Sequence, residues 1–385
     1  LYTSSDHYSW NSPSSMSDDG AVTHDWQAIA MSADGGTIVA VAAEDYNYMG
    51  GGVYLSTDFG STWSTAVFGG GASLNLVDVA VAGSGSRLSA VANGGQVWIS
   101  ADAGTTWATE PPAGITPAPT VPMAPAPTPA PSASPRAWSA IASSADGARL
   151  AATVSSGSIY TSADSGASWT EDATAGARNW ASIAMSANGQ RLAAVEGSVD
   201  LSYCDVYGSL WTSSDFGASW TEQAGLGSNC WRGVAMSGDG ATVAAVVDQG
   251  SIWVSTDYGS SWSETSDPDS NSMPYMSTTY YWRAVAVSSD GTTLAAASDQ
   301  GVWTSGDSGA TWGQAYDAGM TYWSNLRDIA MSDDGSLMAV VEYSGALYTS
   351  SDHYSWNSPS SMSDDGAVTH DWQAIAMSAD GGTIV

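Results

Sequence analysis

One polar motif recurs along the chain and holds most of the groups that could do chemistry. It reads Ser-x-Asp-x-Gly-x-x-Trp, and its six full matches place aspartates and tryptophans at Asp58, Asp102, Asp164, Asp215, Asp257, Asp307, Trp63, Trp107, Trp169, Trp220, Trp262 and Trp312. An aspartate can transfer protons, ligate a metal ion or accept backbone hydrogen bonds in a turn. Because these aspartates recur at equivalent places, we favour the third role: the carboxylate fixes its own turn, glycine permits the bend and tryptophan caps the sheet edge.

A seventh copy departs from the motif. The residues Ser350-Ser351-Asp352-His353-Tyr354-Ser355-Trp356 are one position short and lack the glycine, and the identical residues occupy Ser4 to Trp10.

The other charged residues give little support for catalysis. Arginines fall at repeated positions, namely Arg87, Arg149 and Arg191 in one set and Arg232, Arg283 and Arg327 in another. Repetition of this kind indicates a structural role. Histidine occurs only at His7, His24 and their copies, so few histidines are available for acid–base catalysis. No aspartate stands out as misplaced, although two carboxylates facing each other across a cleft, as in glycoside hydrolases, stay an alternative. We expect no enzyme, cofactor or metal ion, with Ca²⁺ bridging of acidic surfaces left open.

The elements that position the motif form a cassette. Each cassette has an apolar run, a Ser-x-Asp-Gly turn, a second apolar run, a Val-Trp-x-Ser strand and the closing tryptophan. Cassettes start 42 to 62 residues apart, at Trp26, Leu76, Trp138, Trp180, Trp231, Trp282 and Leu326, and restart at Trp372. Four short strands in this length are typical of one β-propeller blade.

The motif resembles the Asp-box of sialidase-like and sortilin-like propellers. This resemblance implies an all-β propeller fold, and the seven cassettes of four short strands predict a seven-bladed propeller with four strands in each blade. Sialidase-like enzymes also carry an Arg-Ile-Pro segment, which is missing here. The family further includes a photosystem-assembly factor, which fits poorly with a proline-rich tract and a disulfide.

A second, longer repeat encloses the cassettes. Residues Leu1–Val39 reappear unchanged as Leu347–Val385, which gives a period of 346 residues with seven cassettes. We expect a window of a longer tandem polymer, with 1–346 as one propeller and 347–385 as the start of the next; a partial duplication is the alternative. Strands in 1–10 could complete the seventh blade with 323–341, leaving 347–356 to close the next ring.

The expected loops fall on two faces. Turns joining strands one to two and three to four are short, whereas the other connections vary in length and should carry partners. Cys204 and Cys230 both fall in the variable set, so we predict a disulfide and an oxidising compartment; two free thiols are the alternative. Candidate binding tyrosines in this set are Tyr46, Tyr48, Tyr203, Tyr207, Tyr275, Tyr280 and Tyr281. They suit sugar stacking or protein contacts, or they pack on one another.

A proline-rich insertion spans 111–135, with ten of the fourteen prolines. Alternating proline favours polyproline II. The tract resembles hydroxyproline-rich wall glycoproteins of plants and green algae, which implies O-glycans on Thr116, Pro117, Pro119, Thr120, Pro125, Pro127, Thr128, Pro129, Pro131, Ser132 or Ser134. A bare loop is the alternative.

Charge limits the choice of partner. The chain has 39 acidic residues against 8 basic ones, a net charge of −31, so nucleic acid and anionic membranes are unfavourable partners. No apolar run reaches the length of a membrane span. We therefore expect a secreted, extracellular or cell-wall structural protein, a fibre of tandem propellers whose partners are identical units, O-glycans and extracellular polysaccharide. A glycan- or protein-binding propeller is the first alternative and a glycoside hydrolase the second.

Overall fold

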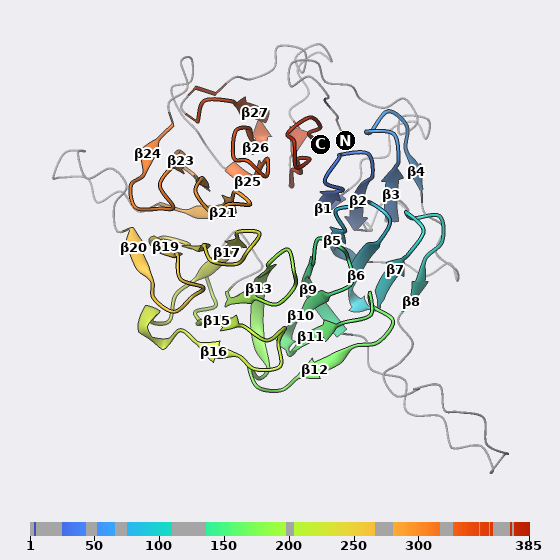
Figure 1. The fold of residues 1–385 in the computed structure, drawn as a ribbon, viewed down its shortest axis with the longest axis horizontal. Coiled ribbons are helices and arrows are strands. Elements are labelled where there is room, and N and C mark those ends of the chain that lie inside the picture. The colour runs from blue at the N-terminus through green and yellow to red at the C-terminus, as the bar shows by residue number, and fades with distance from the viewer. Residues whose placement is uncertain are drawn as a thin grey trace.

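The computed structural model describes residues 4, 25–43, 52–65, 75–109, 136–197, 204–265, 280–315, 326–345, 347–353, 355–356, 370–371 and 373–385. Within them the regular structure is β-strand, apart from one 3-10 turn, η2 (Ala224–Leu226). Figure 1 shows the strands grouped into sheets that surround a central axis.

The first strand of each sheet lies nearest the axis (Figure 1). These strands are β1 (Asp25–Met31), β5 (Leu76–Val81), β9 (Arg136–Ser143), β13 (Arg178–Met185), β17 (Trp231–Met236), β21 (Trp282–Val287) and β25 (Leu326–Met331). Second strands follow after a tight turn: β2 (Ile38–Ala43), β6 (Leu88–Gly95), β10 (Leu150–Gly157), β14 (Leu192–Glu196), β18 (Val243–Val247), β22 (Leu294–Ser298) and β26 (Met338–Gly345). Every residue of β14, β18 and β22 is buried, because alanine and valine fill both faces of a strand that neighbouring sheets cover.

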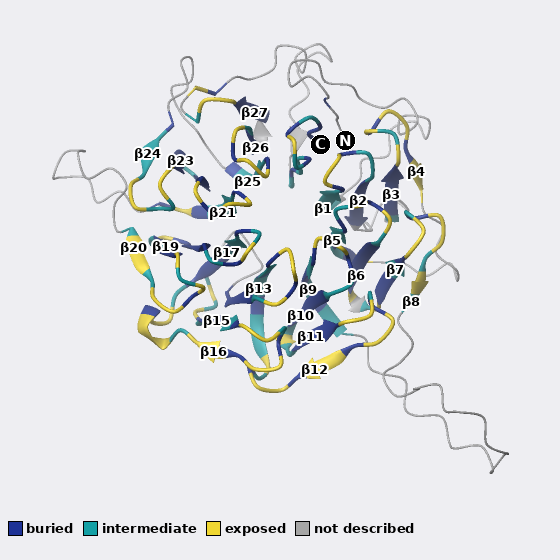
Figure 2. Cartoon of the chain, in the orientation of Figure 1, coloured by how far each residue is buried: buried dark blue, intermediate teal, exposed yellow. Residues whose placement is uncertain are grey.

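Third and fourth strands lie progressively farther out. The third strands are β3 (Gly52–Ser56), β7 (Val97–Ser100), β11 (Ile159–Ser162), β15 (Leu210–Ser213), β19 (Ile252–Ser255), β23 (Gly301–Ser305) and β27 (Leu347–Ser350). The fourth strands are β4 (Ser64–Thr65), β8 (Ala108–Thr109), β12 (Thr170–Asp172), β16 (Thr221–Glu222), β20 (Ser263–Thr265) and β24 (Gly313–Gln314). The fourth strands are short, and most of their residues are exposed (Figure 2). Short polar edges of this kind discourage pairing with other chains.

Strands pair in sequence order and antiparallel, as in β1-β2-β3-β4. Extended second strands also pair with the next sheet: β6 with β9, β10 with β13, and β26 with β28 (His370–Asp371). The resulting all-β assembly of antiparallel sheets has the arrangement of a propeller.

The core lies between the sheets. A tryptophan at or near the start of a first strand reaches back to the preceding sheet: the indole N–H groups of Trp180, Trp231 and Trp282 donate to backbone carbonyls there, each at 3.0 Å. All three side chains are fully buried. Each tryptophan thus contributes apolar area and satisfies its one polar atom, which orients neighbouring sheets.

The tight turns after the first strands form a closed cycle around the axis. In each, a backbone N–H donates to the carbonyl of the next turn at 2.7–2.9 Å, in the order Ala33, Gly83, Ala145, Ala187, Gly238, Ser289, Asp333, Ala379 and back to Ala33. This cycle has eight members, one more than the seven cassettes of a period predict. The extra member is Ala379, the second copy of Ala33, because residues 373–385 take a place of their own between β25 and β1.

Contacts on both sides hold this extra segment. Ile375 and Ile384 pack with Val341 and Leu347, whereas Val385 packs with the sheet that contains Tyr54. Ser4 pairs with Ile384 through two backbone hydrogen bonds of 3.0 Å. In this structure Leu347–Ser350 completes the β25–β26 sheet, so the expected exchange, in which 1–10 completes 323–341, is not observed. Proximity explains the difference, since one residue separates β26 from β27.

Candidate functional site

Each Asp-box is a hydrogen-bonded turn. Asp58 accepts the backbone N–H of Thr62 at 2.8 Å and the hydroxyl groups of Thr62 and Ser56 at 2.5 and 2.8 Å. Ser56 in turn accepts the N–H of Gly60 at 2.8 Å, and the indole N–H of Trp63 donates to the Gly60 carbonyl at 3.0 Å. The same carboxylate bonds recur at Asp102, Asp164, Asp215, Asp257 and Asp307. These oxygens are engaged in the fold.

The bend in the box needs two residues with left-handed backbone. Gly104 has φ of 82°, and the residue before it, Ala103, has φ of 52°. A Cβ on Gly104 would lie 2.5 Å from Cδ2 of Leu55 in the preceding sheet, so glycine also permits close packing between sheets. The motif predicts the glycine, but it does not predict the positive φ of its neighbour.

The two kinds of turn share one face of the molecule, which we call the turn face. The box turn bonds to the tight turn of the same sheet, as when the N–H of Phe59 donates to the Gly36 carbonyl. Arginines on this face reach the box of the next sheet. Arg149 lies over the ring of Phe216 at 4.7 Å, Arg191 lies over Tyr258 at 3.9 Å, and Arg87 donates to Ser165.

Hydrogen bonding keeps the turn-face aspartates ionised. The hydroxyl and backbone N–H of Thr311 lower the pKa of Asp307. In the tight turn at Asp334, the backbone N–H and hydroxyl of Ser336 lower the pKa to about 2. The turn face is therefore a strongly anionic surface at neutral pH.

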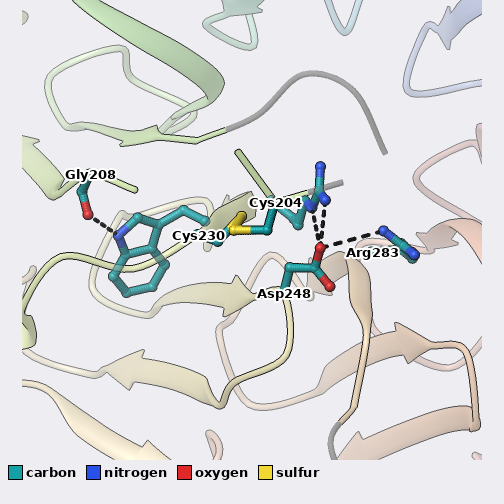
Figure 3. The surroundings of a disulfide bond; sticks show 7 residues. Cys204, Gly208, Cys230, Asp248 and Arg283 are labelled. Atoms are coloured by element: carbon teal, nitrogen blue, oxygen red, sulfur yellow. Dashed lines mark hydrogen bonds and ion pairs between the residues drawn. A yellow bond between two sulfur atoms is a disulfide. The ribbon is translucent and has the colours of Figure 1, made fainter. Parts of the chain in front are cut away.

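The opposite face, here called the loop face, carries the other connections. Cys204, between β14 and β15, forms a disulfide with Cys230, directly before β17, as predicted (Figure 3). Beside it, Gly208 and Asn229 exchange two backbone hydrogen bonds of 2.9 Å. The disulfide thus ties a loop of one sheet to the first strand of the next, and it is compatible with secretion.

A buried ion pair lies next to this disulfide. The Arg232 guanidinium donates to Oδ2 of Asp248 at 2.5 and 3.1 Å, and the two side chains are 1% and 3% exposed. Arg283, from the next sheet, approaches the same oxygen at 3.8 Å (Figure 3). The Asp248 N–H donates to the Cys230 carbonyl at 2.8 Å, so the disulfide and the ion pair form one structural unit.

The arginines of three successive sheets influence one another here. Desolvation lowers the pKa of Arg283, and the charges of Arg232 and Arg327 lower it further, whereas Asp248 acts in the opposite direction. Desolvation also raises the pKa of Asp299, whose carboxylate accepts the N–H of Tyr281 at 3.0 Å. The repeated arginine positions thus bring like charges together around shared carboxylates.

The described tyrosines of the loop face differ in exposure. Tyr207 is 65% exposed and Tyr281 is 38% exposed, with the Arg283 guanidinium 5.9 Å from its ring centroid. Tyr280 is buried against Trp282 and Trp303, so it belongs to the core. Tyr46, Tyr48, Tyr203 and Tyr275 lie outside the described residues, as do the 111–135 insertion and all its glycosylation candidates.

Two aspartates that the sequence analysis did not single out lie within first strands. Asp78 accepts the N–H groups of Val79 and Ile141 at 2.9 and 2.8 Å, and Asp328 accepts those of Ile329 and Ile375 at 2.9 and 3.0 Å. Each carboxyl therefore bonds its own strand to the next sheet. A sequence signal was available, because both aspartates occupy the β-bulge position of their first strands. The other first strands have a small residue at this position, namely Ala28, Ala140, Ser182, Gly233 and Ala284.

Burial raises the pKa values of both carboxyls, whereas the pKa values of the box aspartates are lowered. Desolvation raises the pKa of Asp78 to about 7 despite its two N–H donors, with a smaller contribution from the charge of Asp328. Desolvation likewise raises the pKa of Asp328 to about 6. Both residues retain some surface, but the surrounding protein dominates their electrostatics.

Across the described residues, no group of three or more His, Cys, Asp or Glu side chains is arranged to hold a metal ion. The described part of the chain also contains no helix with the length and apolar character needed to cross a membrane.

Comparison with known proteins supports the fold. Residues 210–223 match the family model of the BNR-Asp box repeat. No protein of curated function matches the chain. A solved structure of YCF48 bound to D1 peptide has a TM-score of 0.55 at 16% identity, covering 83% of this chain and 90% of that one. YCF48 from Cyanidioschyzon merolae gives 0.55 at 15% identity, covering 83% and 94%.

A third similar structure is the GH74 xyloglucanase from Xanthomonas campestris, with a TM-score of 0.53 at 16% identity. It covers 93% of this chain, but this chain spans only 63% of the xyloglucanase. At such identities the likeness concerns fold alone. Together with the box geometry, it identifies a β-propeller of the Asp-box type.

Proposed function

We propose that this chain belongs to an extracellular structural protein that forms a fibre of tandem propellers, with a period of 346 residues and seven cassettes in each period. One observation carries the proposal: identical segments occupy equivalent positions in the ring. Ala33 and its copy Ala379 are neighbours in the turn cycle, and Asp333 donates to Ala379 at 2.8 Å as other turns do.

The junction between the last cassette and a second copy of the first uses ordinary contacts. Asp328 bonds to Ile375, the copy of Ile29, in the same way that Asp78 bonds to Ile141. Leu347 of β27 packs with Ile375 and Ile384. The second copy of the first cassette therefore packs on the last cassette with the kinds of contact that other neighbouring cassettes use.

Charge and covalent chemistry support an extracellular fibre. The net charge of −31 and the ionised turn-face aspartates would keep neighbouring fibres apart in solution. The Cys204–Cys230 disulfide suits an oxidising compartment. O-glycans on the 111–135 insertion, after proline hydroxylation, would add to this separation.

Electron microscopy of native material and of recombinant chains with one, two and three periods tests the proposal. The expected result is a rod that lengthens by one propeller with each added period. Discrete particles whose length does not change with the number of periods would contradict it.

A binding propeller is the second candidate. The exposed Tyr207 and Tyr281 stand on the loop face, and Tyr281 lies beside the Arg283 guanidinium, an arrangement that suits sugar stacking or a peptide contact. The similar YCF48 structure holds a D1 peptide, so a propeller of this kind can bind one. Selective binding on glycan and peptide arrays that disappears in Tyr281→Ala, but not in Tyr258→Ala on the turn face, would favour this function.

A further inference from the structure

Three sheets carry an aromatic ring at the same position of the Asp-box. The residue between the aspartate and the glycine is Phe59 in the sheet of β1, Phe216 in the sheet of β13 and Tyr258 in the sheet of β17. Their backbones are left-handed, with φ of 60°, 60° and 65°. Bulky side chains are uncommon in this conformation, and the box also forms with Ala103 or Ser165 there. The fold therefore does not require a ring at this position.

An arginine of the preceding sheet lies over two of these rings. The guanidinium carbon of Arg149 is 4.7 Å from the ring centroid of Phe216, and that of Arg191 is 3.9 Å from the ring centroid of Tyr258. Both arginines directly precede a second strand, β10 or β14. The face of an aromatic ring attracts a guanidinium electrostatically. These two contacts show which chemical group fits beside a ring at this position.

Phe59 differs, because a threonine takes the place of the arginine. A Cβ added to Gly35, in the tight turn after β1, would meet Thr383 at 2.6 Å. The corresponding Cβ on Gly189 would meet Arg149 at 2.5 Å, so Thr383 stands where the arginines stand. All eight arginines of the chain are among the described residues, and none lies over Phe59, which is 52% exposed. The ring is therefore open to a cation from another molecule.

The charges around Phe59 also favour a cation. Desolvation raises the pKa of Asp58, but hydrogen bonds within its turn outweigh this effect and lower the pKa overall. Hydrogen bonds from a neighbouring hydroxyl and backbone N–H likewise lower the pKa of Asp34. The negative charge of Asp34 also acts on Asp380, in the neighbouring tight turn. The surroundings of Phe59 are thus anionic at neutral pH, and a positively charged occupant is complementary to them.

We infer that Phe59 is a docking point for an arginine side chain of a basic partner peptide. The guanidinium lies over the ring as Arg149 lies over Phe216, with the carboxylates of Asp34 and Asp58 beside it. A guanidinium is favoured over an ammonium group because it is planar and stacks on aromatic faces. The anionic turn face attracts basic segments in general, and the ring selects arginine among them. This inference does not depend on the proposed fibre, since it concerns one sheet and its neighbour.

Binding of a fluorescein-labelled hexa-arginine peptide to the full chain, followed by anisotropy at physiological salt, tests the inference. Phe59→Ala should weaken this binding about two- to fivefold, the contribution of an exposed cation–ring contact. Phe216→Ala is the matched control and should leave the affinity unchanged, because Arg149 already lies over that ring. A hexa-lysine peptide reports attraction by net charge, and its affinity should change less in Phe59→Ala. Equal affinities of the native chain and Phe59→Ala for hexa-arginine would contradict the inference.

A second variant fills the position from within the chain, and it carries the test if Phe59→Ala does not fold. Thr383→Arg places a guanidinium where three other sheets have a native arginine, so it should cover the Phe59 ring and weaken hexa-arginine binding at least as much. Thr242→Arg is the matched control: it adds the same charge at the corresponding position of another sheet, whose neighbouring box has Ser308 in place of a ring. Equal losses in these two variants would show that charge alone acts and would reject the docking point.

A stacked sugar is the other occupant that suits an exposed aromatic ring. Titration of the same variants with neutral cello-oligosaccharides distinguishes the two occupants. Sugar binding that is lost in Phe59→Ala, with hexa-arginine binding unchanged, would assign the ring to a glycan and overturn the inference. Weaker hexa-arginine binding in Phe59→Ala, without any sugar binding, supports it. These measurements do not involve rods, so neither result bears on the proposed fibre.

Discussion

The turn face and the loop face belong to the same sheets but are stabilised differently. On the turn face one hydrogen-bond pattern is repeated, as at Asp58 and Asp307, so no single copy holds the ring. On the loop face the disulfide and the described ion pairs differ from sheet to sheet, and the disulfide lies beside the buried ion pair of Asp248. The turn face is thus stabilised by many copies of one motif, whereas on the loop face a single substitution can remove an interaction that the other sheets do not repeat.

Breaking the Arg232–Asp248 pair should have the largest effect on stability. Arg232→Ala would leave the Asp248 carboxylate, 3% exposed, without its closest cation, at a cost of about 3–5 kcal/mol. Urea unfolding followed by tryptophan fluorescence measures it. Arg191→Ala is the matched turn-face variant; it removes a stacked contact with Tyr258 and should lose about 1 kcal/mol. Equal losses in the two variants would remove the distinction between the faces.

Removing the disulfide should come next. A Cys204→Ser/Cys230→Ser variant opens a link across a sequence separation of 26 residues, and the chain-entropy estimate is about 3 kcal/mol. Thermal unfolding of the variant, compared with oxidised and reduced native chain, measures the loss. Identical melting temperatures for all three would show that the disulfide does not stabilise the loop face.

The enclosed aspartates should make stability fall as pH rises. Asp78 and Asp328 have folded pKa values of about 7 and about 6, above their unfolded values, so their contribution is fully present near pH 4 and is lost as pH rises through 6 and 7. Turn-face carboxyls such as Asp334 have lowered pKa values, so their contribution is present above pH 4 and is lost toward pH 2. The melting temperature should therefore be highest near pH 4 to 5.

An Asp78→Asn/Asp328→Asn variant isolates the first effect. Asparagine does not titrate, so the decline between pH 5 and 8 should become shallower while the acid side is unchanged. A variant whose pH profile overlays that of the native chain would show that net charge alone causes the decline.

Changing one box should have a modest effect. Asp58→Ala removes the acceptor for one backbone N–H and two hydroxyl groups in a solvated turn, and should lose about 1–2 kcal/mol. Asp58→Asn keeps one acceptor oxygen and should lose less in the same urea titration. A loss as large as that of Arg232→Ala would show that a single box stabilises the fold as strongly as the buried ion pair, which would contradict the difference between the two faces.

The exposed tyrosines should contribute least to stability. Tyr207→Ala and Tyr281→Ala should each stay within about 0.5 kcal/mol of the native chain, since their side chains are substantially exposed. Loss of binding on arrays without loss of stability would locate a partner site on the loop face. A large loss of stability would instead show that these rings pack in the fold.

The sequence predicts local structure here better than it predicts closure. The Ser-x-Asp-x-Gly-x-x-Trp spacing and the apolar runs are local signals, and the propeller, the boxes and the Cys204–Cys230 bond follow from them. The number of turns in the cycle does not follow in this way. Ala33 and Ala379 are identical turns that both fit beside a neighbour, so counting cassettes could not show that both would be used.

The candidate site was less predictable because it depends on contacts between residues that are distant in the sequence. Nothing local in Arg232 or Asp248 shows that their side chains meet in the interior, since they lie 16 positions apart, one in β17 and the other directly after β18. Asp78 could have been found as an acidic residue within an apolar strand, but its bond to Ile141 of the next sheet required the assembled structure. The loop-face tyrosines divide in the same way: Tyr280 and Tyr281 are adjacent, yet one is core and the other is exposed.

The turn cycle also bears on how such a gene can change. Every link runs in one rotational sense and joins like to like, from Ala33 to Gly83 and onward to Ala379, so no link specifies the size of the whole. Unequal recombination between the two stretches that encode residues 1–39 and 347–385 would add or delete a complete period without creating a new sequence junction. Length in this protein can therefore vary between lineages, or between alleles, without any search for new compensating substitutions.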